Sequence, residues 1–327
     1  MSIDHSNAGE AEHAHHRSLA TLGDAANLLF PVLPTSTMCA AARAYGRVRS
    51  LRERDKMRVL IENISQIPGV THERAGTLAR WAMEDREVRS LLLVLVPQLT
   101  LGEMKRLIQL EGLEHLDQAL AHGKGVLLLL SHMHSLGALV AVVMLRKMGY
   151  DVQVSMEVKH DPWSNSHLRA VMQRVLGPRP NIPEAVGAFF CQFNIRPMVE
   201  RLQKNVIVAQ TGDGWHSAAF VDCDFMGRKL PFTTGVISVA RITGSMVVPT
   251  FVGGRAPNLR MTFEKPVSVG REPDSVATAV RAYAARLEHH LMLSPHAWEH
   301  FTIEHTFDAM LEHRDKLLRD KYLEKHG

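Results

Sequence analysis

The sequence predicts an α/β fold with a mixed central sheet flanked by helices and a helical N-terminal portion. Short apolar runs alternate with longer segments of helical periodicity, which is the pattern of strands connected by helices. Hydrophobic residues make up 46% and charged residues 22% of the 327 residues, as in an ordinary folded protein. A chain of this length buries a large core, and we find no internal repeat.

Three parts follow along the chain. Residues 1–17 are polar and predict a disordered tail. Residues 18–110 have mainly helical periodicity, interrupted by a short apolar segment at 29–33. Residues 111–327 predict the α/β core, which ends in a charged helix over 304–325.

The elements of the core are predicted from apolar runs and the turns between them. The first strand is Val126–Leu130, which follows a Gly-Lys-Gly turn and precedes a loop and an apolar helix that ends near Gly149. Further strands are expected at 152–156, 205–209, 246–251 and 259–263, a hairpin or extended arm at 220–232, and helices at 164–176, 235–241 and 274–293.

The best catalytic candidates are two histidines in the loop after the first strand. His132 and His134 lie at the carboxyl end of that strand, where α/β proteins usually place their ligands. Two histidines two residues apart share one face if the segment is extended. The alternative is that either is a hydrogen-bonded core residue. Asp213, Trp215 and His216 follow the strand at 205–209, so we expect them near the same site.

Charge and cysteine usage limit the class of protein. A net charge of +4 fits an anionic surface or a phosphorylated substrate and is too weak to indicate a nucleic-acid partner. Three widely spaced cysteines show no paired metal-ligand pattern and fit a reduced cytoplasm. We expect no metal and no cofactor. No apolar stretch is long enough to span a membrane. We expect a cytoplasmic protein whose contact with the inner membrane, if any, is peripheral.

Three segments, in this order and spacing, carry a family resemblance: GLEHLDQALAHGKGVLLLLSHMHS, TGDGWHSAAF and FMGRKLPFTTGVISVARITGSMVVPTF. They resemble the bacterial lipid A biosynthesis (lauroyl/myristoyl) acyltransferases of the lysophospholipid acyltransferase superfamily. SPHAWEHF near the C-terminus is similar to a closing Trp-containing segment of that family. The resemblance covers about residues 50–305. It implies transfer of an acyl group from an acyl carrier protein or coenzyme A thioester to a hydroxyl of a lipid acceptor.

The resemblance also implies a His-x4-Asp/Glu motif, in which the carboxylate orients a histidine base. The usual distance to a later Gly-Tyr pair favours His134 as the motif histidine. The acid is missing in either register, because Gly137 lies five residues after His132 and Leu139 five after His134. Three explanations stay open: Asp213 or Glu157 replaces the acid, His132 orients His134, or transferase activity has been lost and a binding role kept.

We therefore predict a fatty acyltransferase that uses a hydroxyl or amine acceptor, with His134 as the base, His132 as its support and Asp213 as a catalytic candidate. The residues expected to contact substrate are Ser135, Lys159, Trp215, Arg228, Thr234, Gly235 and Arg241. The expected partners are an acyl carrier protein or acyl-CoA donor and a lipid or small-molecule acceptor. The alternatives are a catalytically silent acyl-chain or carrier-protein binding module and a thioesterase-like hydrolase.

Overall fold

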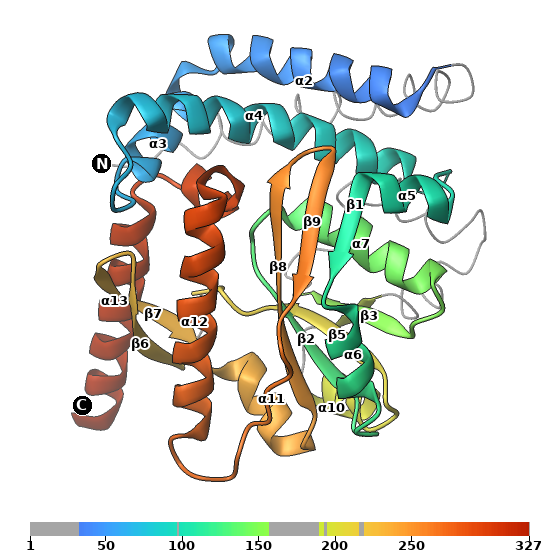
Figure 1. Ribbon diagram of the computed structural model, residues 1–327. Coiled ribbons are helices and arrows are strands. Elements are labelled where there is room, and N and C mark those ends of the chain that lie inside the picture. Colours follow the sequence, from blue (N-terminus) through green and yellow to red (C-terminus); the bar gives the residue numbers. More distant parts are fainter. Residues whose placement is uncertain (1–32, 97, 157–189, 193–194, 216–218, 327) are drawn as a thin grey trace.

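A seven-stranded mixed sheet forms the centre of the molecule (Figure 1). The computed structural model describes residues 33–96, 98–156, 190–192, 195–215 and 219–326. The strand order is β1-β9-β8-β2-β5-β3-β4, and the β8–β9 pair alone is antiparallel in this sheet. The α/β fold class with a mixed sheet and a helical N-terminal part is therefore confirmed.

The strands of this sheet are β1 (Ile108–Glu111), β2 (Val126–Leu130), β3 (Val152–Met156), β4 (Phe190–Gln192), β5 (Ile207–Thr211), β8 (Met246–Arg255) and β9 (Asn258–Phe263). The predicted hairpin is also present, as the antiparallel pair β6 (Phe220–Phe225) and β7 (Arg228–Thr233), which forms a separate two-stranded sheet. The predicted helix at 164–176 lies outside the described residues.

Strand β2 lies between the two hydrophobic cores of the molecule. All five of its residues are buried, which is typical of a parallel strand covered on both faces. Because side chains alternate along a strand, Leu127 and Leu129 enter one hydrophobic core, whereas Val126, Leu128 and Leu130 enter the other. The two cores hold helices against the two faces of the sheet.

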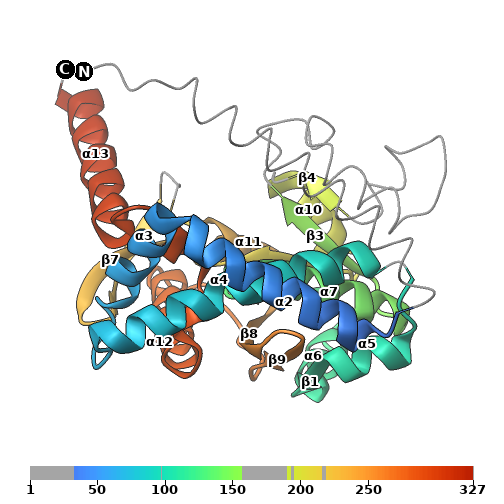
Figure 2. The same cartoon turned by 90° about the horizontal axis from the view of Figure 1, so that it is seen from above.

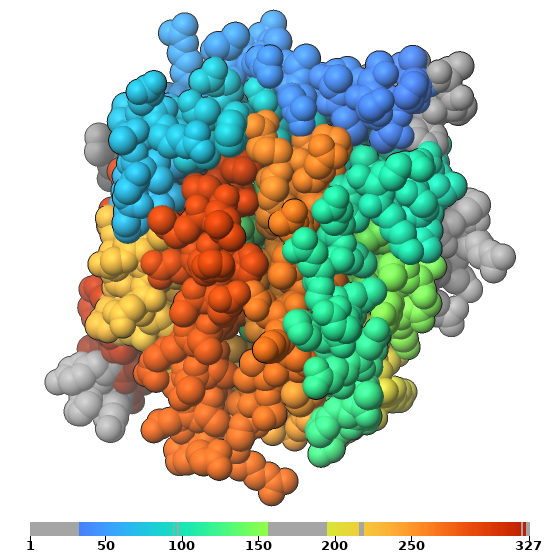
Figure 3. Space-filling model, in the orientation of Figure 1, coloured from blue at the N-terminus to red at the C-terminus, as the bar shows by residue number. Residues whose placement is uncertain are grey.

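The helices of the N-terminal part are α2 (Thr35–Arg52), α3 (Arg54–Ile64), α4 (His72–Leu95) and α5 (Leu101–Leu107). Helices α2 and α4 lie side by side across one end of the molecule, over the end of the β8–β9 hairpin (Figures 1 and 2). The space-filling view shows the same covering of the hairpin end by α2 (Figure 3). Strand β1 follows directly after α5, so the predicted helical portion ends in a strand that its sequence pattern did not reveal.

The core helices are α6 (Leu113–Leu120), α7 (Ser135–Lys147), α10 (Ile195–Leu202), α11 (Gly235–Thr243), α12 (Ser275–Leu293) and α13 (Thr306–His326), and the 3-10 turns η1 (Pro295–Ala297) and η2 (Glu299–Thr302) separate the last two. Helix α7 is apolar because α4 and the sheet cover it, and eight of its residues are buried. It begins directly after the loop that carries the two histidines.

Candidate active site

The loops after β2 and β5 bring a histidine and an aspartate together. These strands are parallel neighbours, so their carboxyl ends lie at the same edge of the sheet. His132 Nδ1 lies 2.7 Å from Asp213 Oδ1, and the backbone N–H of His132 donates to Asp213 Oδ2 at 2.8 Å. The carboxylate therefore holds both the ring and the backbone of His132.

Asp213 stays ionised although its side chain is fully buried. Burial raises the pKa of this carboxyl, but His132, His300 and the Trp298 indole N–H together lower it well below its usual range. Trp298 Nε1 donates to Asp213 Oδ2 at 2.9 Å, and His300 Nε2 lies 3.1 Å from the backbone carbonyl of Asp213. A buried carboxylate with this many donors is a fixed negative charge beside the His132 ring.

His132 has the properties of a general base. Burial lowers the pKa of its imidazole, but the charge and hydrogen bond of Asp213 outweigh burial and raise the pKa overall. With Nδ1 bound to Asp213, Nε2 is left for a substrate, and no residue in the described part of the chain hydrogen-bonds it. The side chain is 32% exposed, so solvent or an acceptor reaches it.

His132 and Asp213 are called the dyad below. A pocket of about 740 Å³ opens in front of this dyad. The polar part of its wall includes His132, Ser135, Glu299 and His300. Its apolar wall comes mainly from α4, α7 and the neighbouring strands and includes Leu93, Leu130, Leu136, Leu139, Val142, Val154 and Ala209. An apolar hollow with a few convergent polar groups at one side is the usual form of a small-molecule site.

The segment after α12, called the clamping segment below, holds the loop that carries His132 and His134 in place. Met133 and Trp298 form an antiparallel bridge, and the backbone N–H of Glu299 donates to the His132 carbonyl at 3.0 Å. The Glu299 carboxylate also accepts from the backbone N–H of Ser135 at 3.0 Å and from the Ser135 hydroxyl. Residues more than 150 positions apart in the chain thus fix the geometry of the dyad.

His134 lies in a different environment from His132. The sequence analysis predicts His134 as the base and His132 as its support, whereas the geometry favours His132 as the base. His134 has a left-handed backbone (φ 47°), so the loop is not extended and the two rings do not share one face. The side chain is fully buried, and it does not line the pocket that holds His132. In this structure His134 therefore has no contact with the space in front of His132.

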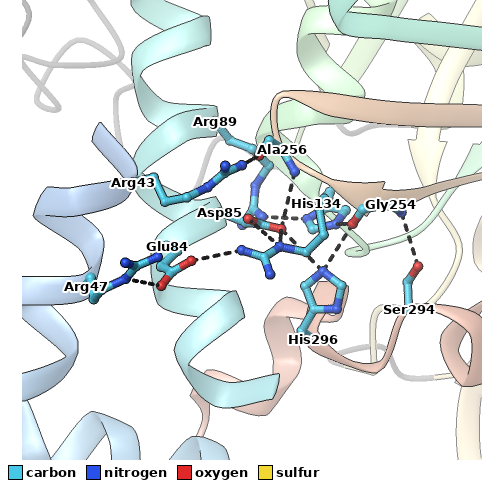
Figure 4. Close-up of polar contacts among 11 residues, drawn as sticks. Arg43, Arg47, Glu84, Asp85, Arg89, His134, Gly254, Ala256, Ser294 and His296 are labelled. Carbon is cyan, nitrogen blue, oxygen red and sulfur yellow. Dashed lines mark hydrogen bonds and ion pairs between the residues drawn. The ribbon is translucent and has the colours of Figure 1, made fainter. Parts of the chain in front are cut away.

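Hydrogen bonds occupy both ring nitrogens of His134. Arg89 Nη1 donates to Nδ1, so the proton is assigned to Nε2, which lies 3.1 Å from the Gly254 carbonyl (Figure 4). Burial, followed by the Arg89 charge, lowers the pKa of His134 well below its usual value. Arg89 is itself buried and also donates to Glu299 at 3.3 Å. His134 therefore acts as a neutral link between Arg89 and Gly254.

The structure shows the surroundings of the two positions at which the motif would carry its acid. A Cβ atom at Gly137 would approach Leu259 Cδ1 to 2.6 Å, so a side chain at that position requires the Leu259 side chain to move. Leu139, in the other register, lines the apolar pocket. The carboxylate beside His132 comes from Asp213, on the loop after a different strand.

Of the other predicted substrate contacts, three line the pocket: Ser135, Trp215 and Gly235. Thr234, Arg228 and Arg241 are not among its lining residues. The Arg228 guanidinium lies 4.9 Å from the centre of the Phe307 ring, and Arg241 is exposed on the last turn of α11. Lys159, Glu157 and His216 lie outside the described residues.

Two groups of side chains in the described part of the chain have metal-ligand spacing. One is the dyad with His300 (His132, Asp213, His300), and the other is Asp85, His134 and His296. In the first group the hydrogen bonds described above already use the Asp213 oxygens. In the second, the Arg89 guanidinium beside His134 repels a cation. The polar contacts within both groups are those of a hydrogen-bonded network.

Sequence reasoning missed Arg89, Trp298, Glu299 and His300. The segment SPHAWEHF holds a concentration of histidine, tryptophan and glutamate that marks it as more than a linker, but nothing local indicates which loop it contacts. Arg89 lies among other charged residues of α4, and its burial is a property of the folded state alone.

Comparison with known families identifies a match over most of the chain. Residues 10–303 match the family described as bacterial lipid A biosynthesis acyltransferase, and this range includes the dyad, the pocket and the clamping segment. A search of curated proteins gives no match. Within the described residues, no helix is long and apolar enough to cross a membrane.

Proposed function

Because the chain belongs to the bacterial lipid A biosynthesis acyltransferase family, we propose that it transfers a fatty acyl group from a carrier-protein or coenzyme A thioester to a hydroxyl or amine, with His132 as the base. The observation that carries the proposal is the 2.7 Å contact between His132 Nδ1 and Asp213 Oδ1 at the wall of an apolar pocket. A lipid-like acceptor fits the family, and an amine or soluble acceptor fits the site equally well.

The dyad supplies the proton chemistry of the reaction. Nε2 of neutral His132 takes the proton from the acceptor, whose oxygen or nitrogen forms a bond to the thioester carbonyl carbon. The carbon–sulfur bond then breaks, and the thiolate receives the proton from the imidazolium. Asp213 fixes the tautomer with the proton on Nδ1 and stabilises the imidazolium. No acyl-enzyme is needed.

The pocket provides a place for the acyl chain. Its apolar wall of α7 and strand residues suits a hydrocarbon, because each buried methylene contributes about 0.8 kcal/mol. Ser135 and Trp215 lie in the wall as candidate contacts of the thioester or acceptor. Lys159, Arg228, Thr234 and Arg241 stay predictions for the anionic groups of the donor.

The test is product analysis with purified protein. Acyl carrier protein and coenzyme A thioesters are incubated with alcohol, amine and lipid acceptors, and the products are followed by mass spectrometry for wild type, His132→Ala and Asp213→Asn. We expect acylated acceptor from the wild type, and less of it by a factor on the order of 10³ or more from either variant. Free fatty acid in place of acylated acceptor would identify a thioesterase, and thioester binding without turnover would identify a silent binding module.

A further inference from the structure

A second hollow lies where α2, α4 and the end of β8 meet, and it shares no lining residue with the catalytic pocket. Its volume is about 710 Å³. Four arginines line it: Arg43 and Arg47 from α2, Arg80 from α4 and Arg255 from β8. Figure 4 shows Arg43 and Arg47 pointing from one helix toward α4 and the chain that follows β8. This hollow is called the arginine pocket below.

The acidic groups of the arginine pocket hold its arginines in place and leave an excess of positive charge. Glu84 Oε1 accepts from Arg47 Nε and Glu84 Oε2 from Arg255 Nη2, both at 2.9 Å. Behind the pocket, the buried Asp85 carboxylate accepts from Arg255 Nε at 3.0 and 3.1 Å. Four arginines against these two carboxylates leave two positive charges without a partner charge among the described residues.

Two arginines of the pocket are not fully paired with other residues. Arg80 is exposed and forms no ion pair with any residue that the structure describes. Arg43 donates to the Ala256 carbonyl through Nη2, while its buried Nε has no hydrogen-bond partner in the described part of the chain. A buried donor without an acceptor costs free energy, so the ligand donors that the structure leaves accessible are those of Arg80.

The neighbouring groups favour a compact, oxygen-rich anion. Thr77 and Asn258 add a hydroxyl and an amide to the wall. The Arg255 guanidinium lies 4.4 Å from the centre of the Trp81 ring, so this ring already contacts a cation and a flat aromatic ligand would have to displace it. Guanidinium forks match the oxygens of phosphate, often in bidentate pairs.

We propose that the arginine pocket binds the phosphoryl group of a ligand, at a site separate from the acyl pocket. A phosphate monoester or a pyrophosphate, with its two or more negative charges, matches the unpaired positive charge. The same chemistry comes from two sources, a soluble phosphorylated molecule or the headgroup of an anionic lipid. The proposal does not depend on which histidine is the catalytic base.

Binding to the full-length protein tests this proposal. Inorganic pyrophosphate is titrated by calorimetry at constant ionic strength, with sodium chloride as the salt control. In parallel, the protein is sedimented with phosphatidylcholine vesicles with and without phosphatidic acid. We expect saturable binding in at least one arm: pyrophosphate binding indicates a soluble source, and binding to phosphatidic acid vesicles alone indicates a lipid headgroup.

Matched arginine variants decide whether the binding is in the arginine pocket. We expect Arg80→Gln and Arg47→Gln each to weaken binding roughly tenfold, because each removes a charge-assisted donor. Arg52→Gln is the control, since Arg52 is exposed on the same helix as Arg47 but does not line the pocket. Circular dichroism checks that each variant is folded. Absence of binding in both arms, or equal binding by Arg80→Gln, Arg47→Gln and wild type, overturns the proposal.

Discussion

His132 and His134 belong to one loop, yet their surroundings are opposite. His132 is part of a pocket wall and is bound on one nitrogen by an ionised carboxylate, which raises its pKa. His134 is fully buried and is bound on one nitrogen by a guanidinium, and its pKa is lowered. The two histidines therefore differ in the charge of the partner and in access to the pocket, and their two-residue spacing in the sequence does not reveal either difference.

The largest expected effect is on the His132 side. His132→Ala removes the proposed base, and we expect the rate of acyl transfer to fall on the order of 10⁴-fold, the upper end for general acid–base catalysis. The measurement is kcat/KM with a fixed thioester and acceptor. Unchanged unfolding temperature serves as the control that the loss is chemical. A rate within about tenfold of the wild type would remove His132 from the mechanism.

Asp213→Asn tests the charge of the partner while preserving its shape. We expect a loss on the order of 10³-fold, because an amide does not stabilise the imidazolium. The pH dependence changes as well. In the wild type the neutral base forms as pH rises through a pKa above about 6.5, the usual histidine value. In the variant this rise moves to lower pH. A rate profile with the same midpoint in both proteins would contradict the role of Asp213.

On the His134 side the expected effect is on folding. His134→Ala leaves one donor of the buried Arg89 and the Gly254 carbonyl without this partner, and we expect a loss of about 2–3 kcal/mol of the free energy of unfolding, measured by urea denaturation. His134→Asn is the matched variant, because its side-chain oxygen accepts from Arg89 as Nδ1 does. Less destabilisation by Asn than by Ala is expected, and the reverse order would disagree with the assigned hydrogen bonds.

The smallest expected effect concerns the pocket beside His132. Leu139→Trp fills part of the apolar wall, so we expect the preference among saturated acyl thioesters to move toward shorter chains by about tenfold in the ratio of kcat/KM. Leu318→Trp, at an exposed site on α13, is the control for added aromatic surface. An unchanged chain-length profile for Leu139→Trp would mean that the acyl chain lies elsewhere.

Much of the fold follows from local pattern. The apolar run Val126–Leu130, the hairpin after Phe220 and the last helix lie where periodicity predicts them. Strand β1 escapes prediction because it has only four residues, two of which are polar, and follows directly after α5. Its parallel pairing with β9, which lies far along the chain, makes it a strand.

The site is predicted in part. The rule that loops at the carboxyl ends of parallel strands meet places His132 and Asp213 together. The proposed roles of the two histidines do not follow from this rule. They depend on the left-handed turn at His134 and on the burial of Arg89. The contribution of Trp298 also cannot be predicted from the sequence, since its bridge to Met133 joins two segments that are far apart in the chain.

The most direct test of the account is one NMR titration of the two imidazoles in the folded wild-type protein, with resonances assigned from His132→Ala and His134→Asn. We predict that His132 titrates with a pKa above the ordinary value of about 6.5, because Asp213 stabilises its protonated form. His134 is predicted to stay neutral throughout the range in which the protein is folded. Titration of His134 near the ordinary value, together with a lowered pKa for His132, would contradict the account.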